Sequence, residues 1–155
     1  MIDLVYYSSA SGNTKTFVDS LTLPEGVNVI RLSGVGSPPV QHRPYVLVVS
    51  TYADVLGENA THIDVENFLS RASNVANLAG VVAGGNRNFG KMFALSGRNI
   101  ARRFGVPLLH EFELTGLPED VVIVQDEFAR LIAEYTQMTN IAQARRELTK
   151  QGDIS

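Results

Sequence analysis

Five short apolar segments, spaced along the whole chain, constrain the fold more than any other feature of this sequence. Each has the length of a β-strand and is rich in Val, Ile, Leu, Tyr or Phe. They cover residues 2–7, 27–32, 45–50, 78–84 and 107–114. Several are apolar almost throughout, which is typical of strands buried on both faces of a parallel sheet. The pattern therefore predicts a parallel sheet with helices on both sides.

The segments between these strands have the spacing of amphipathic helices. Helices are expected over residues 16–21, 65–72 and 93–104, and from 118 to about 135. Pro118, followed by Glu119 and Asp120, suits the first turn of the last helix, because proline lacks an amide hydrogen and acids favour the positive end of the helix dipole. Strands alternating with helices indicate a doubly wound α/β fold with right-handed crossovers. For five strands we expect the flavodoxin-like order 2-1-3-4-5.

A chain of 155 residues is long enough for one ordinary domain and too short for a second. We expect that domain to span residues 1–137. After Met138 the sequence becomes polar, which indicates that residues 138–155 form a helix extension or a polar tail.

Composition excludes several classes of function. The chain has no cysteine, so a redox function would need a bound cofactor or metal. Its three histidines show no close ligand spacing, and no metal site is expected. A net charge of −3 argues against general nucleic-acid binding, and no apolar stretch approaches the ~20 residues of a membrane span. We therefore expect a cytoplasmic protein that binds neither nucleic acid nor membrane.

A run of small polar residues follows the first strand and leads directly into a helix. The run is Ser8-Ser9-Ala10-Ser11-Gly12-Asn13-Thr14. Hydroxyls, amides and the backbone N–H groups of a helix start can surround a phosphate without a lysine. Capping of the helix by Ser11 or Asn13 is an alternative reading of the same residues. The spacing of Ser9, Ser11, Gly12 and Thr14 resembles the phosphate loop of flavodoxins, which bind FMN.

Two further loops follow the third and fourth strands, at the edge of the sheet where the phosphate loop is expected. They begin with Thr51-Tyr52-Ala53 and Gly85-Asn86-Arg87-Asn88-Phe89-Gly90. In flavodoxins the corresponding loops hold the isoalloxazine ring. Tyr52 and Phe89 lie among glycines, amides and hydroxyls, which favours a place beside the ring over the ordinary packing of aromatic residues in a core.

The segment from Gly85 to Lys91 also satisfies the pattern G-x-x-x-x-G-K of nucleotide-binding P-loops. Met92 stands where such a loop needs Ser or Thr to bind Mg²⁺, and Phe89 would crowd a loop that wraps a phosphate. These two residues argue against a P-loop.

Several blocks together resemble the NrdI proteins, the accessory flavodoxins of class Ib ribonucleotide reductases. The blocks are Tyr7 to Thr14, Gly85 to Gly90, Val106 to Leu109, and Phe112 to Gly116 with Glu119 to Val121. The resemblance implies a bound FMN that reacts with O2 when reduced and supplies superoxide to the reductase's small subunit for assembly of its radical cofactor. It also implies a flavodoxin reductase or similar protein as electron donor. The chain would then be an accessory redox protein and not a classical enzyme.

The resemblance and the loop composition together give a set of expected FMN-binding residues. They are Ser8, Ser9, Ser11, Gly12, Asn13, Thr14, Thr51, Tyr52, Ala53, Gly85, Asn86, Asn88, Phe89, Gly90, Phe112 and Leu114. One departure concerns residues 53–58, where NrdI proteins typically have several glycines. Here Ala53 makes a backbone flip to positive φ costlier, and Asp54 would disfavour an anionic reduced flavin.

Two classes of function agree with these features. In the first, the protein makes an oxidant for the reductase subunit. In the second, it is an electron-carrier flavodoxin that passes electrons between a reductase and an acceptor protein. Carriers usually present a strongly acidic face to their partners, and a charge of −3 with interspersed arginines is a weak version of it. The first reading is therefore favoured.

Overall fold

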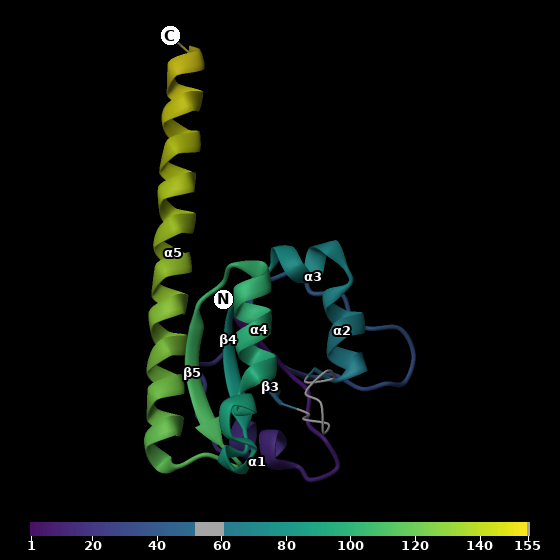
Figure 1. The fold of residues 1–155 in the computed structure, drawn as a ribbon. Coiled ribbons are helices and arrows are strands. Elements are labelled where there is room, and N and C mark those ends of the chain that lie inside the picture. The colour runs from purple at the N-terminus through teal and green to yellow at the C-terminus, as the bar shows by residue number, and fades with distance from the viewer. Residues whose placement is uncertain (52–60, 155) are drawn as a thin grey trace.

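The computed structural model describes residues 1–51 and 61–154 of the chain, and of residues 89, 91, 92 and 152–154 it describes the backbone alone. Its strands are β1 (Asp3–Tyr6), β2 (Val29–Arg31), β3 (Tyr45–Ser50), β4 (Leu78–Gly85) and β5 (Leu108–Glu113). Its helices are α1 (Asn13–Asp19), α2 (Ile63–Leu69), α3 (Ala72–Ala76), α4 (Leu95–Phe104) and α5 (Pro118–Ile154), with a 3₁₀ helix at Arg87–Met92. Figure 1 shows this arrangement.

All neighbouring strands pair in parallel, in the order β2-β1-β3-β4-β5. The order predicted from the sequence is therefore confirmed. The chain reverses its direction of winding between β1 and β3, and in open α/β sheets ligands bind outside the carboxyl ends of the strands at such a point.

Helices cover both faces of the sheet, and each face has its own core. On one face, Phe17 of α1 and Phe128 of α5 pack against inward-facing side chains of β1, β3 and β4. On the other, Phe68 of α2 and Ile100 of α4 pack against the alternate side chains of the same strands. Figure 1 shows α5 on one side of the sheet and α2 and α4 on the other. This accounts for the nearly continuous apolar character of the central strands.

Helix boundaries differ from the sequence prediction for identifiable reasons. The first helix begins at Asn13 and not at residue 16, because Gly12 already turns the chain with a φ of 74°. The helix expected from residue 93 begins at Leu95, because Phe93 is extended and Ala94 has a left-handed φ of 56°. The short helix α3 and the 3₁₀ helix were not predicted. The last helix continues without a break to Ile154.

Within the described part of the chain, no helix combines the length and the apolar character needed to cross a lipid bilayer.

Candidate functional site

A cavity of about 160 Å³ opens at the carboxyl ends of the central strands. It is lined by Ser9, Ser11, Asn13, Thr14, Ser50, Thr51, Gly85, Asn86 and Leu114. These residues come from the turn after β1 and the start of α1, from the ends of β3 and β4 with the residues that follow them, and from the residue after β5, so four separate segments of the chain meet here. No side chain of this lining carries a formal charge. The cavity therefore offers hydrogen-bonding groups, and a bound anion would be held without an ion pair.

The first wall of the cavity is the turn that leads into α1. Gly12 adopts a left-handed conformation, and its amide donates to the Ser9 carbonyl at 3.0 Å. A Cβ at Gly12 would meet no atom within 4 Å, so the conformation and not a lack of space calls for glycine here. The Ser8 hydroxyl accepts a hydrogen bond from the Lys15 amide at 3.0 Å and so holds the start of the helix.

The first amides of α1 are available to a ligand. Among the described residues, the amides of Asn13 and Thr14 donate to no protein group. Both residues line the cavity. The ammonium group of Lys15 instead pairs with Asp19 on the exposed side of the helix. The helix start thus contributes N–H groups and the positive end of its dipole, with no cationic side chain.

Hydroxyl groups connect α1 to the end of β3. The Thr14 hydroxyl lies 2.5 Å from the Ser50 hydroxyl, and the Thr51 hydroxyl accepts a hydrogen bond from the Ser96 amide at 3.0 Å. Thr14 is buried and Ser50 is half-buried. The floor of the cavity is therefore tied to α1 on one side and to the start of α4 on the other.

Glycine at position 85 lets the loop after β4 lie close against the start of α4. A Cβ at Gly85 would lie 2.7 Å from the backbone nitrogen of Ala94. The Asn86 side chain then accepts a hydrogen bond from the Asn88 amide at 2.9 Å and begins the 3₁₀ helix. Gly90, within that helix, has a φ of 60°. The glycines of this block therefore serve one close approach and one left-handed turn.

The end of β5 fixes the loop after β4 from the opposite side. The Leu114 amide donates to the Gly85 carbonyl at 2.9 Å, although Leu114 itself has a left-handed φ of 52°. The Glu113 carboxylate accepts a hydrogen bond from the Arg87 amide at 2.9 Å. A negative charge thus lies next to the cavity and orients the first residues of the loop.

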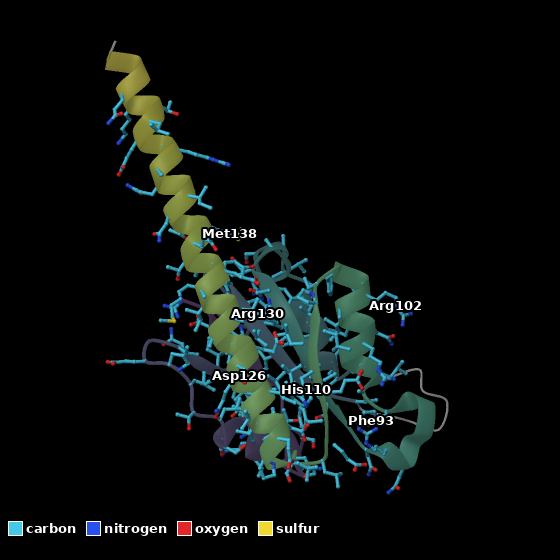
Figure 2. All side chains as sticks on the ribbon, turned by 90° about the vertical axis from the view of Figure 1, so that its left-hand side faces the viewer. Phe93, Arg102, His110, Asp126, Arg130 and Met138 are labelled. Atoms are coloured by element: carbon cyan, nitrogen blue, oxygen red, sulfur yellow. The ribbon has the colours of Figure 1, made fainter. Side chains whose placement is uncertain are left out.

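Behind this loop, two arginines flank one aromatic ring. The Phe93 ring lies 4.3 Å from the Arg87 guanidinium and 5.7 Å from that of Arg98, measured to the ring centre. Arg98 also makes two hydrogen bonds to Glu111 of β5, at 2.8 and 2.6 Å. Figure 2 shows Phe93 next to the 3₁₀ helix, on the side of the molecule away from α5. The cluster joins α4 to β5 and supports the loop from outside the cavity.

The turn after β5 is held by a carboxylate at the start of α5. Asp120 accepts hydrogen bonds from His110 at 2.6 Å and from the Leu117 amide at 2.7 Å. Burial alone would raise the pKa of Asp120, but these two hydrogen bonds, together with the electrostatic effects of His110 and Arg87, outweigh it. The pKa therefore lies below its ordinary value of 3.8. This carboxylate caps α5 and fixes the segment that carries Leu114.

The structure brings together many of the residues expected from the sequence. Eight of them line the cavity: Ser9, Ser11, Asn13, Thr14, Thr51, Gly85, Asn86 and Leu114. Ser8, Gly12, Asn88 and Gly90 shape the adjoining turns. Phe112 instead lies in the core, 1% exposed and stacked on Phe17 at 4.0 Å between ring centres. Tyr52 and Ala53 lie outside the described residues, as does the side chain of Phe89.

Sequence reasoning missed Ser50 and Glu113 as residues at or next to the cavity. Ser50 ends the predicted strand over residues 45–50, and a hydroxyl at the carboxyl end of an otherwise apolar run is a usable signal. The role of Glu113 depends on a contact with a residue 26 positions earlier, which no local pattern reveals.

Comparison with known proteins agrees with this geometry. The family model described as "NrdI Flavodoxin like" matches residues 5–126. A "Protein NrdI" from a Ruegeria species is 44% identical over 93% of this chain and 100% of its own length. One from Chromohalobacter salexigens is 47% identical over 81% of this chain and 92% of its own length.

Among solved structures, a short-chain flavodoxin associated with a bacterial microcompartment shares the fold. Its TM-score is 0.54 at 18% identity, over 86% of this chain and 97% of that one. At 18% identity, this structural similarity supports the fold assignment alone. The family model and the curated relatives carry the assignment further: this chain belongs to the NrdI family of flavodoxin-like proteins.

Proposed function

We propose that this protein binds FMN in the cavity at the carboxyl ends of β1, β3, β4 and β5. In its reduced form it would supply a superoxide-type oxidant to the small subunit of a class Ib ribonucleotide reductase. The observation that carries the proposal is the match to the NrdI family over residues 5–126, together with a cavity formed by the loops that hold FMN in flavodoxins. In this proposal, residues 1–137 form the FMN-binding domain. The reaction of the reduced protein with O2 takes place in the cytoplasm.

The residues present suit the phosphate of FMN. The free amides of Asn13 and Thr14 and the hydroxyls of Ser9 and Ser11 converge on one cavity. A phosphate ester carries a double negative charge and several acceptor oxygens, and it is well matched by hydrogen-bond donors at a helix start. The neutral lining also agrees with flavodoxin-type loops, which hold the phosphate without lysine.

The protein's own groups would position the flavin and limit its exposure. Gly85, Asn86 and Leu114 line the same cavity as the start of α1 and would contact the ring system. Reduced flavin reacts with O2 to give superoxide, and this is the chemistry that the bound cofactor supplies. The chain contains no cysteine, so no thiol competes for the oxidant. A short-lived oxidant is transferred efficiently only if the partner covers the cavity mouth, and we therefore assign docking to the face that includes residues 86–90.

The test measures first the flavin of the purified protein and then the activation of the partner subunit. Purified protein is reduced without oxygen, its visible spectrum is recorded, and O2 is added in the presence of a manganese-loaded class Ib small subunit. A flavin spectrum, rapid reoxidation and a tyrosyl radical signal by electron paramagnetic resonance are expected. An apoprotein that takes up no FMN would overturn the cofactor assignment. FMN binding with no radical or modified tyrosine, but with electron transfer from a reductase to another acceptor, would establish the electron-carrier function in its place.

A further inference from the structure

The last helix extends far beyond the body of the protein. Tyr135 is the last residue of α5 that packs against the core, and every side chain from Thr136 to Gln151 is exposed. Figures 1 and 2 show this part of α5 projecting alone from the molecule. A single helix without packing is marginally stable in water, because most helical stability in proteins comes from an apolar face that is covered. The projecting half of α5 therefore lacks the packing that would stabilise it.

Large apolar side chains lie on this projecting half. Met138 is 62% exposed, Ile141 45% and Leu148 67%. Ile141 and Leu148 are seven residues apart and lie nearly in line along the helix, as in a coiled-coil seam. Ile123, in the first half of α5, is 40% exposed and lies on the same side by helical spacing. Apolar side chains thus lie on this side near both ends of the helix, with the ion-paired Arg130 and Glu134 between them.

Charge is distributed unequally along α5. Residues 118–135 contain five acidic residues and one basic residue: Glu119, Asp120, Asp126, Glu127, Glu134 and Arg130. Residues 136–154 contain three basic and two acidic residues: Arg145, Arg146, Lys150, Glu147 and Asp153. Figure 2 shows Asp126, Arg130 and Met138 in succession along the helix. Within the described residues, Asp126, Arg145, Arg146 and Lys150 take part in no ion pair.

We infer that α5 is a dimerisation helix, which pairs in antiparallel orientation with α5 of a second copy of this chain. An antiparallel pair places the basic end of each helix beside the acidic half of the other, so the unpaired charges complement one another. Leu148 of one copy then packs near Ile123 of the other, and Arg145 lies near Asp126. Because the same helix supplies both surfaces, the contact is two-fold symmetric and closes on itself. A parallel pair would place acid against acid.

Sedimentation velocity of the full-length protein tests the pairing. A dimer is expected at low salt, with weaker association at high salt, because exposed charge pairs are screened. Leu148→Glu buries a carboxylate in the apolar contact and should raise the dimer Kd by about tenfold or more. Gln143→Glu adds the same charge on another side of the helix and should leave the Kd nearly unchanged. A wild-type protein that stays monomeric at every concentration and salt level contradicts the inference.

Disulfide cross-linking tests the orientation, because the chain has no native cysteine. In the antiparallel pair the two-fold axis passes near residues 135–137, so Gln137→Cys should give a covalent dimer on mild oxidation. Leu148→Cys lies far from its own symmetry mate and should not. Cross-linking of both variants would indicate a parallel pair, and cross-linking of neither would place the dimer contact elsewhere. The inference is independent of FMN binding, so colourless protein can be tested in the same way.

Discussion

The hydroxyl groups of Thr14 and Ser50 lie 2.5 Å apart and join the first turn of α1 to the carboxyl end of β3. Thr14 lines the cavity although it is only 2% exposed. Ser50 is the last residue of its strand. This contact fixes the distance between the helix start and the sheet, and with it the width of the proposed phosphate site.

Thr14→Ala should therefore weaken FMN binding. A hydrogen bond to a charged group contributes about 1.5–3 kcal/mol, which corresponds to a loss of about tenfold or more in affinity. Titration of the apoprotein, followed by flavin fluorescence, measures the change. Thr14→Ser retains the hydroxyl and should restore most of the affinity. Riboflavin lacks the phosphate and should bind wild-type protein far more weakly than FMN; equal affinities for the two flavins would rule out a phosphate site here.

Two substitutions at Glu113 should have separable effects. Glu113→Ala removes the acceptor of the Arg87 amide and should loosen the loop after β4, so that FMN binds about 3- to 10-fold more weakly. Glu113→Gln keeps an acceptor oxygen but removes the charge. Its FMN affinity should stay near that of wild type, and its midpoint potential should rise, because a nearby carboxylate opposes the negative charge gained on reduction. Spectroelectrochemical titration decides, and an unchanged potential in Glu113→Gln would place the carboxylate out of range of the flavin.

The stability that Asp120 contributes through its ionised carboxylate should be lost only below about pH 3.8. Its folded-state pKa lies below the ordinary value of 3.8, so its contribution is complete above that value and is lost as the pH falls through the lower, folded-state pKa. Asp120→Ala should cost about 1 kcal/mol at neutral pH through loss of the helix cap. At a pH well below 3.8 the variant and the wild type should converge. Urea unfolding at the two pH values provides the measurement, and a constant difference would show that ionisation plays no part.

Gly85→Ala should disturb both the fold and the site. The new methyl group would meet the backbone of Ala94, which cannot move without shifting the start of α4. We expect a loss of about 1–3 kcal/mol in the free energy of unfolding and weaker FMN binding. Gly105→Ala is the matched control: its φ of 65° makes alanine costly by about 1–2 kcal/mol, but its Cβ would point into open space. The control should lose stability and retain its FMN affinity.

The strands could be predicted from the sequence because they depend on a local signal, and their order because doubly wound folds of five strands commonly share it. Residues 45–49 and 78–84 contain no polar side chain except that of Tyr45, and this composition is typical of strands covered on both faces. The polar turn from Ser9 to Thr14 could also be located from the sequence, since its residues are contiguous in the chain. Their convergence with Leu114 on one cavity follows from topology alone, because parallel strands end at the same edge.

The features that escaped prediction depend on contacts between distant residues or on backbone strain. The hydrogen bond from the Arg87 amide to Glu113 joins the segments at the ends of β4 and β5. No local sequence pattern around either residue predicts it. The start of α4 was misplaced because Ala94 adopts a left-handed conformation that alanine seldom takes. Phe112, one of the expected FMN contacts, lies in the core beside Phe17, because its alternating position in β5 directs the side chain to that face.

The uncharged lining of the cavity has a practical consequence for the cell. A site that holds an anion by short-range hydrogen bonds has no ion pair for dissolved salt to weaken, so cofactor retention should vary little with ionic strength. Association through the oppositely charged halves of α5 should vary strongly. A rise in ionic strength inside the cell would therefore lower the fraction of dimer without releasing FMN. Dimerisation and cofactor binding would then respond to salt independently of each other.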